Sequence, residues 1–260
     1  MNSYRFHKYQ GAGNDFVIID NRENKFDAKD FALVNQLCDR RFGVGSDGLM
    51  LLENDDHYTF RMRYYNSDGR EATMCGNGGR CIVAFAHHLG LFEKEVTFVA
   101  VDGVHQAIME SDEVVDLEMI DVDFVERIGE DFYLNTGSPH YVVFQDLSDL
   151  DVVKEGRSIR YNARFKEEGT NVNFVSMDKD CLKVLTYERG VEDETLACGT
   201  GVTAAAIAAY VMSGCQYEGF DIEAKGGRLG VRFQAKSINE FEHVWLKGPA
   251  VRVFEGDITL

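Results

Sequence analysis

The chain contains an internal repeat, and this repeat restricts its fold more than any other feature of the sequence. The stretches EATMCGNGGRCIVAFAHHLG (71–90) and ETLACGTGVTAAAIAAYVMSG (194–214) each place a Glu four residues before a Cys. In both, Cys-Gly-Asn/Thr-Gly follows and leads into an apolar run. Repetition of this kind predicts a chain built from two copies of one supersecondary unit.

The spacing of a second pair of segments supports the same interpretation. GNDFVIID (13–20) resembles GSPHYVVF (137–144). Cys75 lies 61 residues after Asn14, and Cys198 lies 60 residues after Ser138. Because order and spacing both match, we expect two homologous halves with a boundary near residues 117–130.

The local pattern around each Cys predicts what the halves contain. YTFRMRYYNSDG and CLKVLTYERG are alternating, strand-like runs upstream of the two cysteines. RCIVAFAHHL and GVTAAAIAAYVM are apolar nearly all the way round, which is typical of a helix enclosed by other structure. We therefore predict that each half is an α+β unit with strands around one central helix.

Composition excludes several classes of function. The chain has 27 basic and 44 acidic side chains, and the net charge of −17 opposes binding to a phosphate backbone, so no nucleic-acid partner is expected. The N-terminal sequence lacks the apolar core of a signal peptide, and the longest apolar stretch is too short to cross a membrane. These features predict a cytoplasmic protein without membrane association, in which the six cysteines stay reduced.

The two repeated cysteines are the candidate reactive groups. Asn77 and Thr200 are good N-cap residues, so both helices are predicted to begin just after Cys75 and Cys198. A helix N-terminus lowers the pKa of a thiol and binds a carboxylate. A single Cys would suggest covalent acyl transfer or simple packing in the core. A symmetric pair favours proton transfer, in which one thiolate removes a proton from carbon and the other thiol donates one to the opposite face.

The motifs GAGNDF, YNSDG, MCGNGGRC, GSPH, YERGVEDETLACGTG and FEGDITL occur in this order and resemble those of the diaminopimelate epimerase family. The resemblance runs from about residue 5 to residue 260. It implies two pseudo-symmetric halves, each a mixed β-sheet wrapped around a central α-helix, with the active site between them. The expected domains are 1–117 plus about 251–260, and 118–250, because the last strand of the family returns to the first half.

The resemblance also implies an activity. Members of the family interconvert LL- and meso-2,6-diaminopimelate without a cofactor or metal, in lysine and peptidoglycan biosynthesis. No cofactor is therefore expected here, and a second copy of the chain is a candidate partner in a homodimer. The sequence GVGSDG (43–48) does not alter this expectation, because it follows a helix-like stretch and precedes a strand-like one, the reverse of a dinucleotide-binding motif.

The family motifs assign roles to individual positions. Cys75 and Cys198 match the acid/base pair, and His140 and Glu188 match positions that tune the thiols. The expected substrate contacts are Asn14, Asn66, Gly76, Asn77, Ser138, Asn171, Glu188, Arg189, Gly199 and Thr200. Ser138 replaces the usual Asn but can still donate and accept a hydrogen bond. Gly48 stands where some members have Gln, and it offers no side chain.

Three alternatives remain open from the sequence. A proline-racemase-type enzyme shares the two-thiol arrangement, but that family tends to have His at the position of Asn77. An isomerase of the same fold without thiols is disfavoured by both cysteines. A non-catalytic amino-acid-binding protein would keep the cavity and bind substrate without exchanging its α hydrogen.

Overall fold

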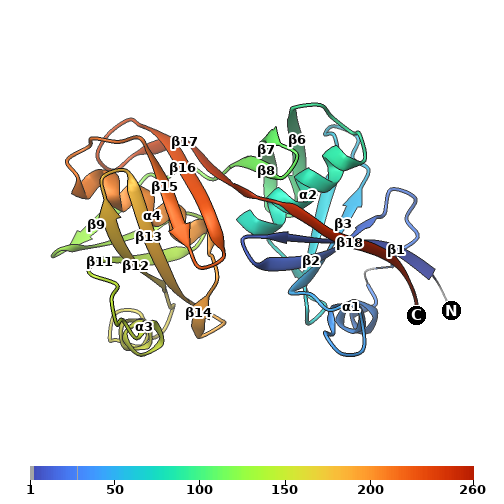
Figure 1. The fold of residues 1–260 in the computed structure, drawn as a ribbon, viewed down its shortest axis with the longest axis horizontal. Coiled ribbons are helices and arrows are strands. Elements are labelled where there is room, and N and C mark those ends of the chain that lie inside the picture. The colour runs from blue at the N-terminus through green and yellow to red at the C-terminus, as the bar shows by residue number, and fades with distance from the viewer. Residues whose placement is uncertain (1–2, 28) are drawn as a thin grey trace. The chain divides into compact units, whose positions relative to one another are not determined.

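The computed structural model describes residues 3–27 and 29–260, and the chain divides into two compact units (Figure 1). The first unit comprises the residues up to Leu117 together with Gly248–Leu260, and the second comprises Glu118–Lys247.

The first unit is a mixed sheet with two helices. Its strands are β1 (Ser3–Gly11), β2 (Asn14–Asp20), β3 (Gly48–Glu53), β4 (Arg61–Asn66), β5 (Glu71–Ala72), β6 (Glu95–Ala100), β7 (Gly103–Ser111), β8 (Val114–Glu118) and β18 (Val251–Thr259), and its helices are α1 (Phe31–Cys38) and α2 (Gly76–His88). The pairs β2–β3 and β4–β6 are parallel, whereas β1–β2, β3–β4, β6–β7 and β7–β8 are antiparallel. β18 pairs antiparallel with β1, so the last strand of the chain completes the sheet that the first strand begins.

Alternating side chains of β2 explain why helices cover both faces of this sheet. Val17 and Ile19 are buried in a cluster with Val34 and Leu37 of α1. Phe16 points to the other face, where its ring lies close to Gly78 of α2. The segment of α2 from Gly76 to Ala86 is buried throughout, as its apolar sequence predicts for a central helix.

The second unit repeats this plan. Its strands are β9 (Val125–Ile128), β10 (Asp131–Asn135), β11 (Pro139–Phe144), β12 (Asn171–Asp178), β13 (Cys181–Glu188), β14 (Asp193–Thr195), β15 (Gly219–Ala224), β16 (Gly227–Ala235) and β17 (Phe241–Pro249), and its helices are α3 (Val152–Arg160) and α4 (Gly199–Met212). β11–β12 and β13–β15 are parallel, and the other pairs within the unit are antiparallel.

The two helices of the second unit also take different faces of their sheet. Val172 and Phe174 of β12 pack with Val152 of α3. Gly156 lets α3 approach closely, because a Cβ atom there would lie 2.4 Å from Cβ of Tyr187. The central helix α4 is almost entirely buried. The predicted class, two repeated α+β halves with a central helix each, is therefore confirmed.

None of the helices in the described part of the chain combines the length and apolarity needed to cross a membrane.

Candidate active site

Each central helix begins directly after one of the repeated cysteines. Cys75 is the N-cap of α2, and its Sγ accepts a hydrogen bond from the backbone N–H of Gly78 at 3.3 Å. Cys198 is the N-cap of α4. Both cysteines have extended backbone conformations and are half-buried. The predicted helix starts are correct, but the prediction that Asn77 and Thr200 are the caps is wrong. The cysteines themselves take that position, and the other two residues lie in the first helical turn.

This placement puts both thiols at the N-terminal end of a helix. The first turn of an α-helix carries backbone N–H groups without intrahelical partners, and the aligned peptide dipoles make that end partly positive. Gly76 and Asn77 provide these groups in α2, and Gly199 and Thr200 provide them in α4. Each thiol therefore adjoins a site suited to a carboxylate or to a developing negative charge.

A chain of hydrogen bonds in the second unit leads from the sheet to Cys198. Thr186 Oγ1 accepts from Nδ2 of Asn173 at 2.8 Å, and Oδ1 of Asn173 lies 2.8 Å from Nδ1 of His140. Nε2 of His140 lies 2.9 Å from the hydroxyl of Thr200, which lies 3.4 Å from Sγ of Cys198. The neighbouring strands β11, β12 and β13 supply the first three residues, in the register that places Asn173 opposite Thr186.

The donor and acceptor of each hydrogen bond between Asn173 and Cys198 follow from the bond that Asn173 donates to Thr186. Because Asn173 donates through Nδ2 to Thr186, its oxygen faces His140 and requires a proton on Nδ1. The other nitrogen of His140 then accepts the hydroxyl proton of Thr200, which leaves the hydroxyl oxygen to accept from the thiol of Cys198. The arrangement favours the protonated form of Cys198.

His140 is held in its neutral form. It is completely buried, and this burial lowers its pKa to about 4, although the hydrogen bond with Asn173 acts in the opposite direction. Arg189 lowers the pKa further by charge repulsion. A neutral imidazole is what the acceptor role of Nε2 requires.

The second glycine of the Cys-Gly-x-Gly motif is needed for this packing. A Cβ atom on Gly201 would lie 2.4 Å from Nδ2 of Asn173 and 3.3 Å from Cβ of Cys198. Helix α4 can therefore approach Asn173 this closely only if residue 201 has no side chain.

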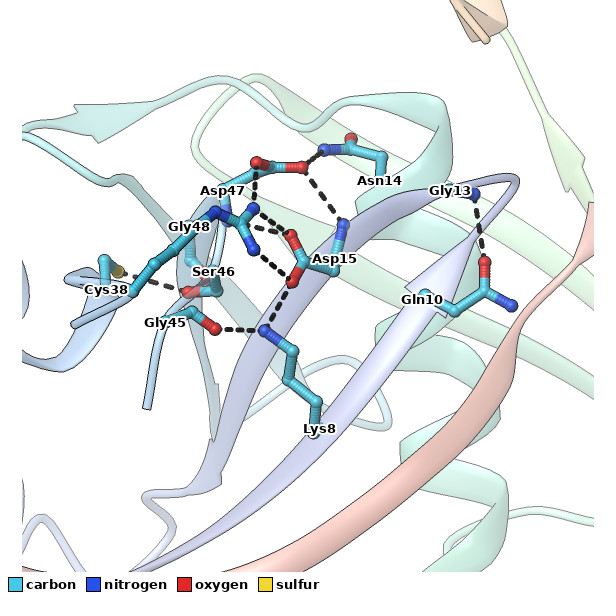
Figure 2. A network of polar contacts seen from close by, with 11 residues as sticks. Lys8, Gln10, Gly13, Asn14, Asp15, Cys38, Gly45, Ser46, Asp47 and Gly48 are labelled. Atoms are coloured by element: carbon cyan, nitrogen blue, oxygen red, sulfur yellow. Dashed lines mark hydrogen bonds and ion pairs between the residues drawn. The ribbon is translucent and has the colours of Figure 1, made fainter. Parts of the chain in front are cut away.

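In the first unit, a network of charged residues fixes Asn14. Figure 2 shows Asn14 joined to Asp47, and Lys8 joined to Asp15 and to the backbone of Gly45. Nδ2 of Asn14 donates to Oδ2 of Asp47 at 2.5 Å, which turns Oδ1 of the amide to the opposite side. An amide oxygen held in this way is an acceptor suited to an ammonium group.

Asp15 is the centre of this network. Its carboxylate lies 2.6 Å from Nζ of Lys8 and 2.6 Å from the guanidinium of Arg40, which also binds Asp47 at 2.7 Å. Partial burial raises the pKa of Asp15, but the hydrogen bonds from Arg40 and Lys8 outweigh it and leave the pKa at about 2. Asp15 therefore stays ionised at every pH at which the protein is expected to work, and its ion pairs with Lys8 and Arg40 persist there.

Asn66 and Gly48 are neighbours at the ends of β4 and β3. They are paired in the sheet, and Asn66 is exposed. A side chain at position 48 has no room, because a Cβ atom there would lie 2.5 Å from the ring of Tyr64 and 2.6 Å from the carbonyl oxygen of Tyr65. The aromatic ring of Tyr64 thus takes the space beside Gly48.

The predicted contacts of the second unit fall into two groups. Asn171 is buried and uses both ends of its amide on the backbone, donating to Pro139 O at 3.0 Å and accepting from Arg189 N–H at 2.9 Å. It therefore joins β11 to the end of β13. Glu188, Arg189 and Ser138 are at least partly accessible.

The structure adds Arg80, Asn173 and Asp47 to the residues identified from the sequence. Arg80 is completely buried in the first turns of α2 and binds Asn77. A charged residue within the apolar run GGRCIVAF was a signal that could have revealed it. Asn173 shows only as one polar residue in a buried strand. Nothing in the local pattern distinguishes Asp47 from an ordinary turn residue.

A separate group in the first unit, His7, His88 and Glu255, places three metal-ligand atoms within 4.8 Å of one another. Glu255 lies 2.5 Å from Arg5 and 3.2 Å from Arg252, and Arg252 also contacts His88 at 3.1 Å. Two guanidinium charges occupy the positions around this group, and they oppose binding of a divalent cation.

Comparison with known proteins identifies the family to which these motifs correspond. The family model described as diaminopimelate epimerase matches residues 6–125 and 132–253. A diaminopimelate epimerase of Flavobacterium psychrophilum is 49% identical over 257 residues, covering 98% of this chain and 100% of its own. The diaminopimelate epimerase of Chlorobaculum tepidum is 42% identical, with 96% and 99% covered, and that of Aquifex aeolicus is 39% identical, with 98% and 97% covered.

Solved structures share the fold at much lower identity. A PhzF-family phenazine biosynthesis protein of Bacillus anthracis superposes with a TM-score of 0.76 at 14% identity, covering 100% of both chains. A probable proline racemase from Agrobacterium radiobacter superposes with a TM-score of 0.67 at 14% identity, covering 99% of this chain and 93% of its own. At this identity the likeness concerns the fold alone.

Proposed function

The chain belongs to the diaminopimelate epimerase family and is an isomerase, and we propose that Cys75 and Cys198 are the two acid/base groups that invert the α carbon of LL- and meso-diaminopimelate. The observation that carries the proposal is the repetition of one local structure, a thiol at the N-cap of a buried helix, in both units. Packing does not require this placement twice, whereas a reaction with two proton-transfer groups does.

The proposed reaction removes one proton from the α carbon and returns one proton to its opposite face. The thiolate of one cysteine takes the α proton, and the electron pair of the broken C–H bond is delocalised onto the substrate carboxylate. The thiol of the other cysteine then donates its proton to the opposite face of the carbon. In the reverse direction the two cysteines exchange roles. The mechanism requires both thiols to reach opposite faces of the same α carbon.

The remaining site residues bind the substrate in this proposal. The backbone N–H groups of Gly76, Asn77, Gly199 and Thr200 stabilise the carboxylate, where negative charge increases in the transition state. The oxygen of Asn14 and the carboxylate of Glu188 are acceptors for the ammonium group. The distal end of the substrate is assigned to the polar residues Asn66, Ser138, Asn171 and Arg189, of which Asn171 acts by holding Arg189.

Solvent isotope exchange tests the proposal directly. Purified protein is incubated with LL-diaminopimelate in heavy water. The stereoisomers are separated by chiral chromatography, and the deuterium content of each is measured by mass spectrometry. The product should carry one solvent deuterium at first turnover while unreacted substrate stays protiated. Product that keeps its own hydrogen would point to a single shared base.

Single substitutions separate the two thiols. Cys75→Ala and Cys198→Ala should each abolish epimerisation with an unchanged circular dichroism spectrum. Cys215→Ala is the matched control, because Cys215 is an exposed thiol outside the proposed site and its loss should leave turnover unchanged. Turnover near the wild-type rate in either of the first two variants would reject the two-base assignment.

A proline-racemase-type activity is the second candidate, supported only by the shared two-thiol arrangement. Asn66 and Arg189 provide polar groups for a distal amino-acid end that proline lacks. We therefore expect no detectable exchange with proline under conditions that exchange diaminopimelate. Faster turnover of proline would assign the chain to that activity instead.

We also propose that the protein forms a homodimer and is located in the cytoplasm. Val253 and Phe254 of β18 are 55% and 48% exposed, and such neighbouring apolar side chains suit a homodimer contact. Light scattering should report a dimer that becomes a monomer in Phe254→Asp, and a monomeric wild-type chain would contradict this. The six cysteines are free thiols, which fits the proposed cytoplasmic location.

A further inference from the structure

Arg80 is a completely buried cation next to the first thiol. Its guanidinium donates to Oδ1 of Asn77 at 2.8 Å, to the carbonyl oxygen of Gly76 at 3.2 Å and to the carbonyl oxygen of Pro249 at 3.4 Å. All three acceptors are uncharged. Burying a cation without a paired carboxylate destabilises a fold, so the position is not explained by packing alone.

The charge of Arg80 acts on the thiols around it. Burial lowers the pKa of Arg80 to about 10, so the side chain remains protonated near neutral pH. The electrostatic interactions that partly offset this burial come from Cys81 and Cys75. Burial raises the pKa of Cys81 far above its ordinary value, which leaves Cys75 as the thiol on which the positive charge can stabilise a thiolate.

Arg80 also determines which way the Asn77 amide faces. A guanidinium has donors only, so the oxygen of the amide must point toward Arg80 and the NH₂ group must point away from it. An amide NH₂ group is a donor of the kind that binds a carboxylate. Arg80 thus fixes the oxygen of the Asn77 amide, whereas Asp47 fixes the NH₂ group of the Asn14 amide.

The internal repeat supplies a comparison within the same chain. Thr203 follows Cys198 by five residues, just as Arg80 follows Cys75, and it too is completely buried. Its hydroxyl donates to the carbonyl oxygen of Gly199 at 2.9 Å, which matches the bond from Arg80 to Gly76. Both units thus have a hydrogen bond from this position to the carbonyl oxygen of the glycine after the cysteine, but only the first unit has a positive charge there.

We propose that Arg80 is a positioning residue that orients the Asn77 amide toward the substrate carboxylate and stabilises the thiolate of Cys75, so that the two thiols differ in charge before substrate binds. Cys75 rests as the thiolate, with the backbone N–H of Gly78 on its sulfur and the guanidinium of Arg80 bound to the carbonyl oxygen of the next residue, Gly76. Cys198 rests as the thiol, because it donates a hydrogen bond to the hydroxyl oxygen of Thr200. The assignment rests on the proposed two-thiol reaction and adds to it a reason for unequal resting states.

Alkylation of the two thiols in one molecule tests this directly. The full chain is treated briefly with iodoacetamide near neutral pH, and peptide mass spectrometry measures the modification of Cys75 and Cys198 separately. The variants are Arg80→Met, Arg80→Lys and the matched control Thr203→Val, and kcat and KM for LL-diaminopimelate are measured on the same preparations.

Arg80→Met should lower the ratio of Cys75 to Cys198 alkylation roughly tenfold or more and raise KM by a similar factor, as expected for loss of a charged hydrogen-bonding group. Arg80→Lys keeps the charge but not the planar fork, so it should restore the alkylation ratio to within about threefold of wild type while KM stays raised. Thr203→Val should leave the ratio within about threefold of wild type, because it removes a bond without removing a charge.

An Arg80→Met protein with the wild-type alkylation ratio and wild-type kcat and KM would overturn the proposal. If Arg80→Met does not fold, both cysteines will react equally fast, and Arg80→Lys then decides, since a wild-type KM in that variant contradicts the positioning of Asn77. A wild-type chain that shows unequal alkylation but no epimerisation would reject the two-thiol function while leaving the charge assignment of Arg80 intact.

Discussion

Replacing His140 with glutamine is expected to remove an acid-sensitive contribution to the stability of the protein. Burial holds the pKa of His140 at about 4 in the folded chain, against an ordinary value of 6.5. Between these two values the unfolded chain binds a proton at this position and the folded chain does not. The free energy of unfolding therefore rises with pH across this window and falls as the solution is acidified.

The size of the effect follows from the displacement of the pKa. One pKa unit corresponds to about 1.4 kcal/mol, so the full displacement amounts to about 3 kcal/mol between pH 6.5 and pH 4. The contribution is fully retained above pH 6.5 and is lost as the pH falls to about 4. Glutamine does not titrate, so the variant lacks this dependence, although it loses some stability at every pH through the altered bonds to Asn173 and Thr200.

Urea unfolding of the wild type and of His140→Gln, followed by circular dichroism at several pH values from 4 to 7.5, measures the difference. Titration of the carboxylates is common to both proteins and cancels in the subtraction. The stability difference should be largest at pH 7.5 and shrink by about 3 kcal/mol toward pH 4. Parallel pH profiles for the two proteins would refute the assignment of a buried neutral imidazole at this position.

Two further substitutions test the supports of the site. Gly201→Ala should lower kcat at least about tenfold, because its Cβ would lie 2.4 Å from Nδ2 of Asn173 and break the chain to Cys198. The control Gly219→Ala has 3.5 Å to its nearest neighbour and should change kcat less than about twofold, and equal effects in steady-state assays would contradict the close-approach argument. Asp47→Ala should raise KM about tenfold with little change in kcat, because it releases the amide of Asn14. Asp68→Ala, at an exposed turn, is its control, and an unchanged KM for Asp47→Ala would show that Asn14 does not need this support.

The architecture of two α+β halves could be predicted from the sequence because both halves contain the same pattern of strands and a central helix. The apolar sequences of both central helices, and the alternation in YTFRMRYYNSDG and CLKVLTYERG, each depend on residues close together in the chain. The return of the last strand to β1 was expected only from the family resemblance, since pairing between Ser3 and Thr259 leaves no local pattern.

The residues that hold His140 and Asn14 in place were harder to predict, because they are distant from them in the sequence. Asn173 and His140 lie on neighbouring parallel strands, and Asp47 and Asn14 lie at the starts of the parallel strands β3 and β2, so the residues of each pair are 33 positions apart. The N-cap prediction failed because it relied on the usual preference for Asn and Thr over Cys, whereas Sγ of Cys75 itself accepts the N–H of Gly78 at the start of the helix. Arg80 could have been recognised as unusual, but its partners could not.

The pairing of β1 with β18 has a consequence for biosynthesis. Every residue of β1 from Ser3 to Gln10 aligns with a residue between Val251 and Thr259, so the first unit needs the final segment of the chain to complete its sheet. The second unit, Glu118–Lys247, is wholly contained in earlier sequence. As the ribosome releases the chain, the unit encoded second can finish folding before the unit encoded first. A copy truncated by premature termination leaves β1 with an unsatisfied row of backbone groups, which distinguishes it from a finished copy for chaperones and proteases.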